Sequence, residues 1–194
     1  NSGCGPEHFE RSFVKIYSMK LLLVFFLASF SIASYAQTRV NPMIPNFGGV
    51  FPIPYAEEKP DPTLDYNIVI EIERPSDKPD TLNWALNNVA RLLNLHVSGG
   101  VPKEKIHVIL AIHGGAAFTV MNNEAYRKKY GVDNPNLKLY QELQEAGVRI
   151  FVCGQSLIAR NIDRLKMVPQ VKIATSMLTT LTTYQLKGYA TLKF

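Results

Sequence analysis

Two side chains capable of covalent and proton-transfer chemistry each follow a predicted strand, the thiol of Cys153 and the imidazole of His113. A thiol that ends a strand and leads into a helix meets free backbone N–H groups and the positive end of a helix dipole. Both favour the thiolate, which is the nucleophilic form of cysteine. A neighbouring imidazole can share the thiol proton or orient a substrate. The predicted chemistry is therefore that of a reactive sulfur.

Cys153 is also the only cysteine that remains if the chain is exported, because Cys4 lies in a segment that we expect to be removed. A lone thiol in an exported protein cannot form an internal disulfide. Three interpretations stay open on the count alone: a buried packing residue, a link to a second chain, or a working sulfur.

An export signal is predicted at about residues 19–36. Met19 and Lys20 form a short basic start, an apolar run follows, and Ala33 to Ala36 supplies small residues for cleavage. The apolar run is shorter than the roughly 20 residues that cross a bilayer, which disfavours a retained anchor. We therefore exclude residues 1–36, an upstream extension plus signal peptide, from the fold. The expected location is periplasmic or secreted, with membrane contact only through the uncleaved signal.

The charge of the chain argues against nucleic acid as a partner. Twenty-one Lys and Arg residues face 16 Asp and Glu residues, for a formal net charge of +5. This mild excess is spread along the chain, and aromatic and basic residues do not alternate as they do in RNA-binding segments.

Residues 37–64 hold six of the twelve prolines together with many apolar side chains. Proline removes backbone donors and fixes φ, so neither a helix nor a central strand is expected there. The segment is too apolar for a free linker. It fits an extended arm that lies across its own domain or across a neighbouring subunit, and a disordered leader is the alternative.

Residues 65–194 alternate short β-branched runs with helical periods, and no internal repeat is visible. The pattern predicts strands at 66–72, 105–113, 148–153, 171–174 and 189–194, and helices from 82 to the glycines at 99–100, at 122–129, from 134 to the glycine at 147, at 156–164 and at 176–186. Strand then helix, repeated, indicates an α/β domain with a parallel sheet covered on both faces.

In open α/β sheets, ligands bind beyond the carboxyl ends of the strands. Cys153 and His113 both fall at that edge, and they are the candidate catalytic residues. The candidate substrate-binding residues are Gly114, Gly154, Gln155, Ser156, Asn134 and Ser176. Asn134 and Ser176 have a second explanation as helix caps. No close metal-ligand pair and no nucleotide-binding glycine pattern occurs, so we predict no metal and no organic cofactor.

Six short segments, taken together in this order and spacing, are similar to the exported branch of the DsrE/DsrF-like family. They are IHGG at 112–115, YRKKYG at 126–131, DNPN at 133–136, AGV at 146–148, VCGQS at 152–156 and QLKGY at 185–189. The resemblance covers about residues 61–194. It implies a three-layer α/β/α fold with a mostly parallel sheet of about five strands, assembled into homo- or hetero-oligomers.

Some members of that family carry persulfide sulfur on a cysteine at a strand end, and Cys153 occupies that kind of position. The resemblance thus implies a sulfur carrier or sulfurtransferase that takes sulfur from, or gives it to, a partner protein or a small sulfur compound. Two alternatives stay open. One is a non-catalytic small-ligand-binding or oligomeric assembly module in which Cys153 only packs, and the other is a thiol redox sensor.

Overall fold

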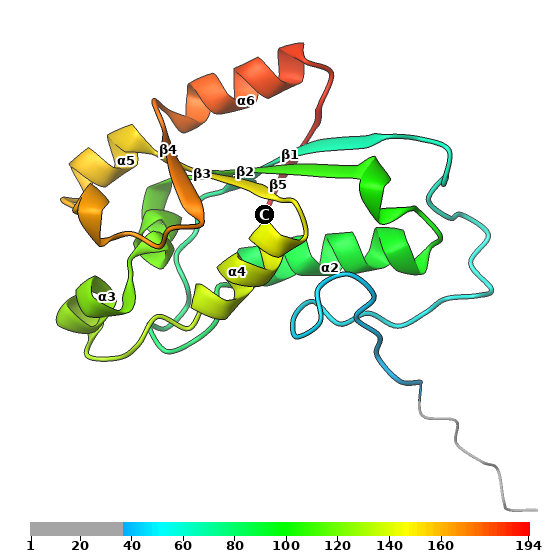
Figure 1. The fold of residues 1–194 in the computed structure, drawn as a ribbon, viewed down its shortest axis with the longest axis horizontal. Coiled ribbons are helices and arrows are strands. Elements are labelled where there is room, and N and C mark those ends of the chain that lie inside the picture. Colours follow the sequence, from blue (N-terminus) through cyan, green and yellow to red (C-terminus); the bar gives the residue numbers. More distant parts are fainter. Residues whose placement is uncertain (1–36) are drawn as a thin grey trace, which may run out of the picture. The chain divides into compact units, whose positions relative to one another are not determined.

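Five parallel strands form a single sheet at the centre of the domain in the computed structural model, which describes residues 37–194 (Figure 1). The strand order is β4-β3-β2-β1-β5, and every neighbouring pair is parallel. The strands are β1 (Tyr66–Ile72), β2 (Ile106–Ile112), β3 (Arg149–Cys153), β4 (Val171–Ala174) and β5 (Ala190–Lys193). The predicted fold class, a three-layer α/β/α domain with about five parallel strands, is confirmed.

The burial of β2 follows from its central place in the sheet. All of its residues except His107 are buried, as expected of a β-branched, apolar strand with neighbours on both edges and helices on both faces. The edge strand β5 is short and exposed throughout, and it carries Lys193 near its end. Short, charged edge strands discourage pairing with other chains.

Helices connect the strands and supply the two outer layers. They are α2 (Trp84–Ser98), α3 (Asn123–Tyr130), α4 (Leu137–Glu145), α5 (Gly154–Ala159) and α6 (Met177–Leu186), with 3-10 turns at Lys103–Lys105, Gly114–Val120 and Arg164–Lys166. Three helix starts differ by two or more residues from those expected, and the helix α2 begins at Trp84 rather than at residue 82. The helix α4 begins after Asn136 rather than at Asn134, and α5 begins directly after Cys153 and ends at Ala159, well short of residue 164.

The face of the sheet that packs on α2 and α4 holds the main hydrophobic core. Alternate strand residues such as Ile70, Leu110 and Val152 meet Leu86 and Leu143 from these helices, and all of them are fully buried. Figure 1 shows α2 and α4 together on this side of the sheet. Strand side chains alternate between faces, so every second residue of each central strand contributes to this layer.

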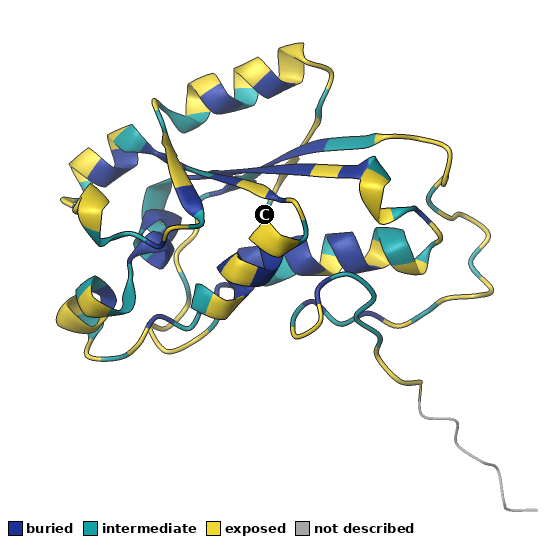
Figure 2. Cartoon of the chain, in the orientation of Figure 1, coloured by how far each residue is buried: buried dark blue, intermediate teal, exposed yellow. Residues whose placement is uncertain are grey.

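The opposite face packs on α6 and holds a much smaller cluster. Val69 and Ile109 meet Tyr184 of α6, with Phe151 and Leu181 partly buried beside them. Figure 2 shows the contrast, because α2 carries a continuous buried face whereas most of α6 is exposed.

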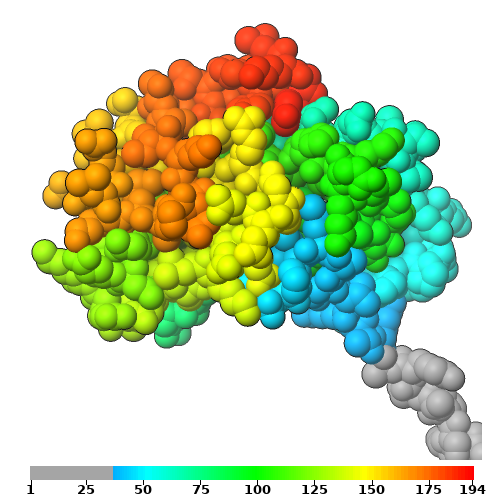
Figure 3. All heavy atoms as spheres, in the orientation of Figure 1, coloured from blue at the N-terminus to red at the C-terminus, as the bar shows by residue number. Residues whose placement is uncertain are grey.

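The Pro-rich arm, residues 37–64, lies on its own domain and adds a further layer over α2. Ile44 and Val50 are buried, and the Asn94 side chain accepts hydrogen bonds from the backbone of Met43 and Ile44. Gly48 packs so closely on α2 that a Cβ there would lie 2.2 Å from the backbone nitrogen of Arg91. Figure 3 shows the arm against the neighbouring surface of the domain.

Residues 38–194 form one compact unit. The predicted signal peptide at 19–36 and the upstream Cys4 lie outside the described residues. Within residues 37–194, none of the helices has the length and apolar character needed to cross a membrane.

Candidate functional site

Cys153 is the last residue of β3 and the N-cap of α5, and its thiol is free. Only 6% of the residue is exposed. Gly154 follows at a point where β4 passes closely, and a Cβ on it would lie 3.0 Å from the Ala174 carbonyl oxygen. The absence of a side chain at Gly154 thus lets the start of α5 pack against the end of β4, which encloses the sulfur.

Four hydrogen-bond donors act on the ionisation of the Cys153 thiol. They are the backbone N–H groups of Met177 and Ser156 and the hydroxyls of Ser156 and Ser176. Burial, the largest single influence, would raise the pKa of Cys153, but these hydrogen bonds together bring that pKa below its usual value. The residue is therefore predisposed to ionise, and its donors come from the first turns of α5 and α6.

Ser156 also connects Cys153 to the neighbouring strand end. The Ser156 hydroxyl oxygen accepts a hydrogen bond of 3.2 Å from the Gly114 N–H, which leaves its own proton free to point at the sulfur. Gly114 has φ +55° and lies so close to Glu73 that a Cβ would meet its carbonyl oxygen at 2.9 Å. Glycine is required there by both conformation and space.

His113 lies beside a carboxylate at the end of β2. Its Nε2 is 2.9 Å from Glu71 Oε1, and both side chains are mostly buried. Lys193 Nζ lies 2.8 Å from the same Glu71 oxygen and 2.7 Å from Glu73 Oε2. The chain of charged groups thus joins the carboxyl ends of β1, β2 and β5.

This charged group sets the ionisation of its members. Burial acts to raise the pKa of Glu71, but hydrogen bonds from Lys193 and His113 outweigh it and leave that pKa lowered. Lys193 likewise lowers the pKa of Glu73, and the two carboxylates raise the pKa of Lys193. Both carboxylates are therefore ionised at neutral pH.

The register of the sheet brings His113 and Cys153 to equivalent positions. Ile112 pairs with Val152, so the next residues, His113 and Cys153, follow at the ends of adjacent parallel strands. Adjacent strands lie about 4.8 Å apart, and residues in register project to the same face. The hydrogen bond from the Gly114 N–H to the Ser156 hydroxyl also joins the two strand ends.

Three donor atoms at this edge, from Glu71, Glu73 and His113, lie within 4.8 Å of one another, close enough to share a metal ion. The Lys193 ammonium already bridges the two carboxylates. In this arrangement the protein's own cation balances the charge of the two carboxylates.

Three further residues were predicted to bind substrate: Ser176, Gln155 and Asn134. Ser176 caps α6 by accepting from the Leu178 N–H, which confirms its explanation as a helix cap. Its hydroxyl also donates to Cys153, and its role in substrate binding stays a prediction. Gln155 is exposed on the first turn of α5.

Asn134 is fully engaged in the structure. Its amide donates to the carbonyls of Thr119 and Met121, and its Oδ1 accepts from Asn136. Asn136, in turn, accepts from the backbone of Asn83 at the start of α2. We interpret Asn134 as a structural residue that joins loops, and neither as the N-cap of α4 nor as a residue with free groups for a substrate.

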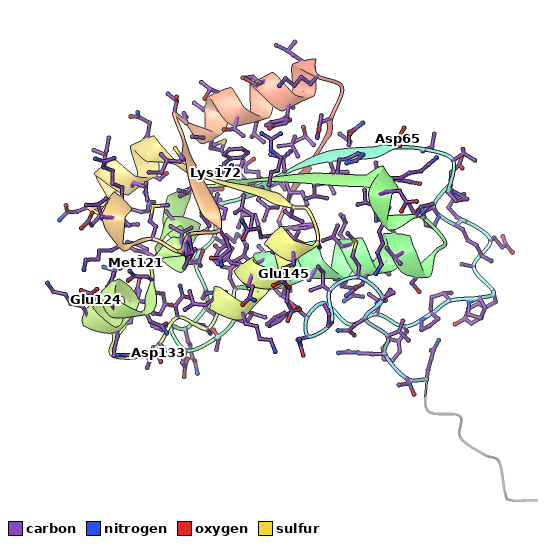
Figure 4. All side chains as sticks on the ribbon, in the orientation of Figure 1. Asp65, Met121, Glu124, Asp133, Glu145 and Lys172 are labelled. Carbon is purple, nitrogen blue, oxygen red and sulfur yellow. The ribbon has the colours of Figure 1, made fainter. Side chains whose placement is uncertain are left out.

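Two cavities lie away from Cys153 and His113. One of 490 Å³ is bounded by the arm and the end of α2, including Ile53 and Leu95. Another of 440 Å³ lies between α3 and the Arg164–Lys166 turn, near Met121 and Glu124, which are labelled in Figure 4. Neither is lined by Cys153 or His113.

Four contributors to the site were not predicted from the sequence: Glu71, Glu73, Lys193 and Met177. Glu71 and Glu73 occupy alternate positions at the end of a strand that is otherwise apolar, which is a signal that could have pointed to them. Met177 contributes its backbone N–H, which almost any residue type could supply, so the sequence holds no signal for it.

Comparisons with known proteins agree with this architecture. The model of the DsrE/DsrF-like family matches residues 67–194. Among solved structures, the protein of unknown function MTH1491 from Methanobacterium thermoautotrophicum is 18% identical, with a TM-score of 0.51 over 67% of this chain and 100% of that one. The ychN protein from E. coli is also 18% identical, with a TM-score of 0.50 over 66% of this chain and 99% of that one.

No curated protein matches the sequence. The two structural likenesses are distant in sequence and support the fold alone. The match to the family model shows family membership as well as fold, because it spans more than half of the chain and includes the strand ends that hold His113 and Cys153. The chain therefore belongs to the DsrE/DsrF-like family.

Proposed function

We propose that this protein is an exported sulfur carrier that holds sulfane sulfur as a persulfide on Cys153. It would work in the periplasm or outside the cell as a homo-oligomer, without metal or organic cofactor. The observation that carries the proposal is the set of four donors around a buried sulfur, which lower the pKa of Cys153 against the effect of burial. Such a setting favours anionic sulfur, and both a thiolate and a persulfide anion are of that kind.

The chemistry is an exchange in which no net oxidation occurs. The Cys153 thiolate attacks the outer sulfur of a donor persulfide R–S–SH. The new S–S bond forms at Cys153, the old one breaks, and its electron pair leaves with the donor as R–S⁻. In the second step an acceptor thiolate attacks the outer sulfur of Cys153–S–SH, and Cys153 leaves as the thiolate that its donors stabilise.

His113 is the proposed proton partner in this exchange. Its position in register with Cys153, and the Gly114 to Ser156 hydrogen bond that ties the two strand ends, support this role. An acceptor arrives at neutral pH largely as a thiol, and a base must remove its proton before attack.

The exposure of Cys153 argues against the redox-sensor alternative. A disulfide between two chains needs the two Cβ atoms to approach within about 4 Å. A residue with 6% of its surface exposed does not present its Cβ to a second chain in this conformation. Small sulfur compounds such as polysulfide meet a weaker steric barrier.

The test is mass spectrometry of the protein after treatment with polysulfide or thiosulfate. We expect an adduct of about 32 Da, the mass of one sulfur atom, that dithiothreitol removes. Peptide mapping should place it on Cys153, and Cys153→Ser should lack it. A chain that gains no sulfur at Cys153 from any of these donors is not a sulfur carrier, and the packing interpretation of Cys153 then stands.

A further inference from the structure

Four charged or titratable side chains meet at the carboxyl ends of β1, β2 and β5: His113, Glu71, Lys193 and Glu73. Only His113 takes part in the proposed sulfur exchange at Cys153. Three contacts among the four side chains are short, at 2.9 Å for His113 to Glu71 and 2.8 and 2.7 Å for Lys193 to the two carboxylates. His113 and Glu71 are only 13% and 14% exposed, whereas Lys193 is 56% exposed. The inner pair is thus shielded, and the outer lysine holds it in place.

The contact to Glu71 decides which nitrogen of His113 carries hydrogen. An ionised carboxylate accepts hydrogen bonds and cannot donate one. Glu71 is ionised at neutral pH, because Lys193 and His113 lower its pKa despite burial. Nε2 of His113 must therefore be the protonated nitrogen, and Nδ1 of the neutral ring is left with a free lone pair.

The register of the sheet places His113 next to Cys153 along the sheet edge. Both His113 and Cys153 follow the paired residues Ile112 and Val152, so they end adjacent strands on the same face. The next residue, Gly114, donates to the Ser156 hydroxyl, and that hydroxyl donates to the sulfur. Ser156 and Gly114 thus tie Cys153 to the backbone beside His113, and the His113 ring in turn contacts Glu71.

We propose that Glu71, held by Lys193, is a positioning residue that fixes His113 in the Nε2–H form, so that Nδ1 takes the proton of an incoming acceptor thiol. The proposal rests on the sulfur-carrier function. In the step concerned, R–SH gives its proton to Nδ1, and R–S⁻ attacks the outer sulfur of Cys153–S–SH. The S–S bond to Cys153 breaks with its electron pair on Cys153, and the protonated ring then releases its proton to solvent.

The direct test is the tautomer of His113 in ¹⁵N-histidine-labelled protein, with the ring signals assigned by comparison with His113→Gln. We expect the Nε2–H form in the wild type. Glu71→Gln should favour the Nδ1–H form, because the glutamine amide can donate to Nε2 where the carboxylate could only accept. An Nδ1–H ring in the wild type would overturn the proposal, even if the variant failed to fold.

The functional test separates transfer from loading. Cys153 is first loaded with sulfur, and the transfer to a small thiol is then timed at neutral pH. Glu71→Gln should slow transfer by about 100-fold, the scale of losing a general base. Glu73→Gln is the matched control, since Glu73 shares Lys193 but is not bonded to His113, and it should slow transfer by less than about threefold.

The outcomes keep the two proposals apart. If wild-type Cys153 never accepts sulfur, the carrier function fails, while the tautomer measurement still reports whether Glu71 sets the ring. If Cys153 loads normally and Glu71→Gln transfers at the wild-type rate, the positioning role of Glu71 is wrong and the carrier function survives. Equal slowing by Glu71→Gln and Glu73→Gln would show a general loss of charge, and it would also overturn the specific role of Glu71.

Discussion

The two faces of the sheet differ in the helices that cover them and in the side chains that they carry. The face toward α2 and α4 is covered by two helices and the arm, and its buried strand residues are all isoleucine, leucine or valine. The face toward α6 has one covering helix and a small cluster around Val69, Ile109 and Tyr184. Toward the carboxyl ends of the strands, this second face replaces apolar side chains with Glu71, His113 and Cys153.

The helices that cover the two faces differ in the same way. The helix α2 has a fully buried apolar stripe that includes Leu86, Val89 and Leu93. The helix α6 contains four threonines, which are weak helix formers, and its Leu178 and Leu186 are exposed. The stability of α6 therefore depends more on its N-cap and on Tyr184 than on a broad apolar contact.

The difference shows how one small domain separates stability from chemistry. Polar groups such as Glu71 and His113 would carry a large desolvation cost in a core of the first kind. On the thinner face they keep partial access to solvent and to each other. The first face can then be packed for stability, while the second holds Cys153, His113 and their hydrogen-bond partners nearer the edge of the domain.

Adjacent residues of β2 give the strongest test, because Leu110 faces α2 and α4 whereas Ile109 faces α6. Leu110→Ala should lower the free energy of unfolding by about 3 kcal/mol, since the crowded core cannot collapse around the cavity. Ile109→Ala should cost about 2 kcal/mol, because a single helix can settle into the space. Urea unfolding of both variants measures the difference.

The same two variants should differ in their effect on the Cys153 thiol. The start of α6 supplies the Met177 N–H and the Ser176 hydroxyl to Cys153, so a shift of α6 in Ile109→Ala should slow alkylation of the thiol. Leu110→Ala should leave the alkylation rate of the folded protein unchanged. Equal effects of the two variants on both stability and alkylation would contradict the division between the faces.

The arm over α2 gives the next largest effect, and it extends the comparison because the α6 face has no such layer. Asn94 is completely buried, and its side chain bonds to the backbone at Met43, Ile44, Phe47 and Gly48. Asn94→Ala should cost about 2 kcal/mol, because it leaves buried backbone groups without partners. Proteolysis within residues 38–60 should become faster.

The matched control for the arm is Asn87, about two turns before Asn94 on the same side of α2, which accepts a single hydrogen bond from the Gly48 N–H. Asn87→Ala should cost about 1 kcal/mol or less, since water can reach that partly buried group. If Asn94→Ala left both stability and proteolysis unchanged, the arm would not be a stabilising layer of this face.

Much of this fold was predictable from periodicity, because the β-branched runs and the glycines that end the helices mark the elements directly. The strand at Tyr66–Ile72 and the helix ending at Ser98 lie where they were expected. The starts of α4 and α5 were not, for a local reason. Asn134 bonds to Thr119 and Met121 rather than to the first turn of α4, and Gly154 packs against β4 and lets α5 begin at once.

The site was predictable only in part, because sequence shows side chains but not the path of distant strands. Cys153 and His113 were identified from their places at strand ends. The partner of His113 comes from β1, and the lysine that holds that partner comes from β5, more than a hundred residues along the chain from it. Sheet order, which brings β5 next to β1, is the information that local patterns lack.

The smallest expected effect compares two serines that both donate to Cys153. Ser156 uses its hydroxyl and its backbone N–H, whereas Ser176 contributes a hydroxyl that also accepts from the Leu178 N–H. Ser156→Ala and Ser176→Ala should each raise the pKa of Cys153 and slow its alkylation at neutral pH, because each removes a hydrogen bond to the thiolate, worth about 1.5 kcal/mol. Each variant should also cost about 1 kcal/mol of stability, Ser176→Ala through the lost helix cap and Ser156→Ala through the lost acceptor of the Gly114 N–H.

The contribution of Cys153 to the free energy of unfolding should depend on pH. The folded protein lowers the pKa of Cys153, so the unfolded chain binds the thiol proton more tightly. The stabilisation by Cys153 relative to Cys153→Ala should therefore be present above the unfolded thiol pKa of about 8.5, and should disappear as the pH falls through the lower folded value. Both serine variants should shrink that gain, whereas Leu110→Ala, on the other face, should lower stability equally at every pH in this range. A gain that persisted undiminished in Ser156→Ala would mean that groups other than these donors hold the thiolate.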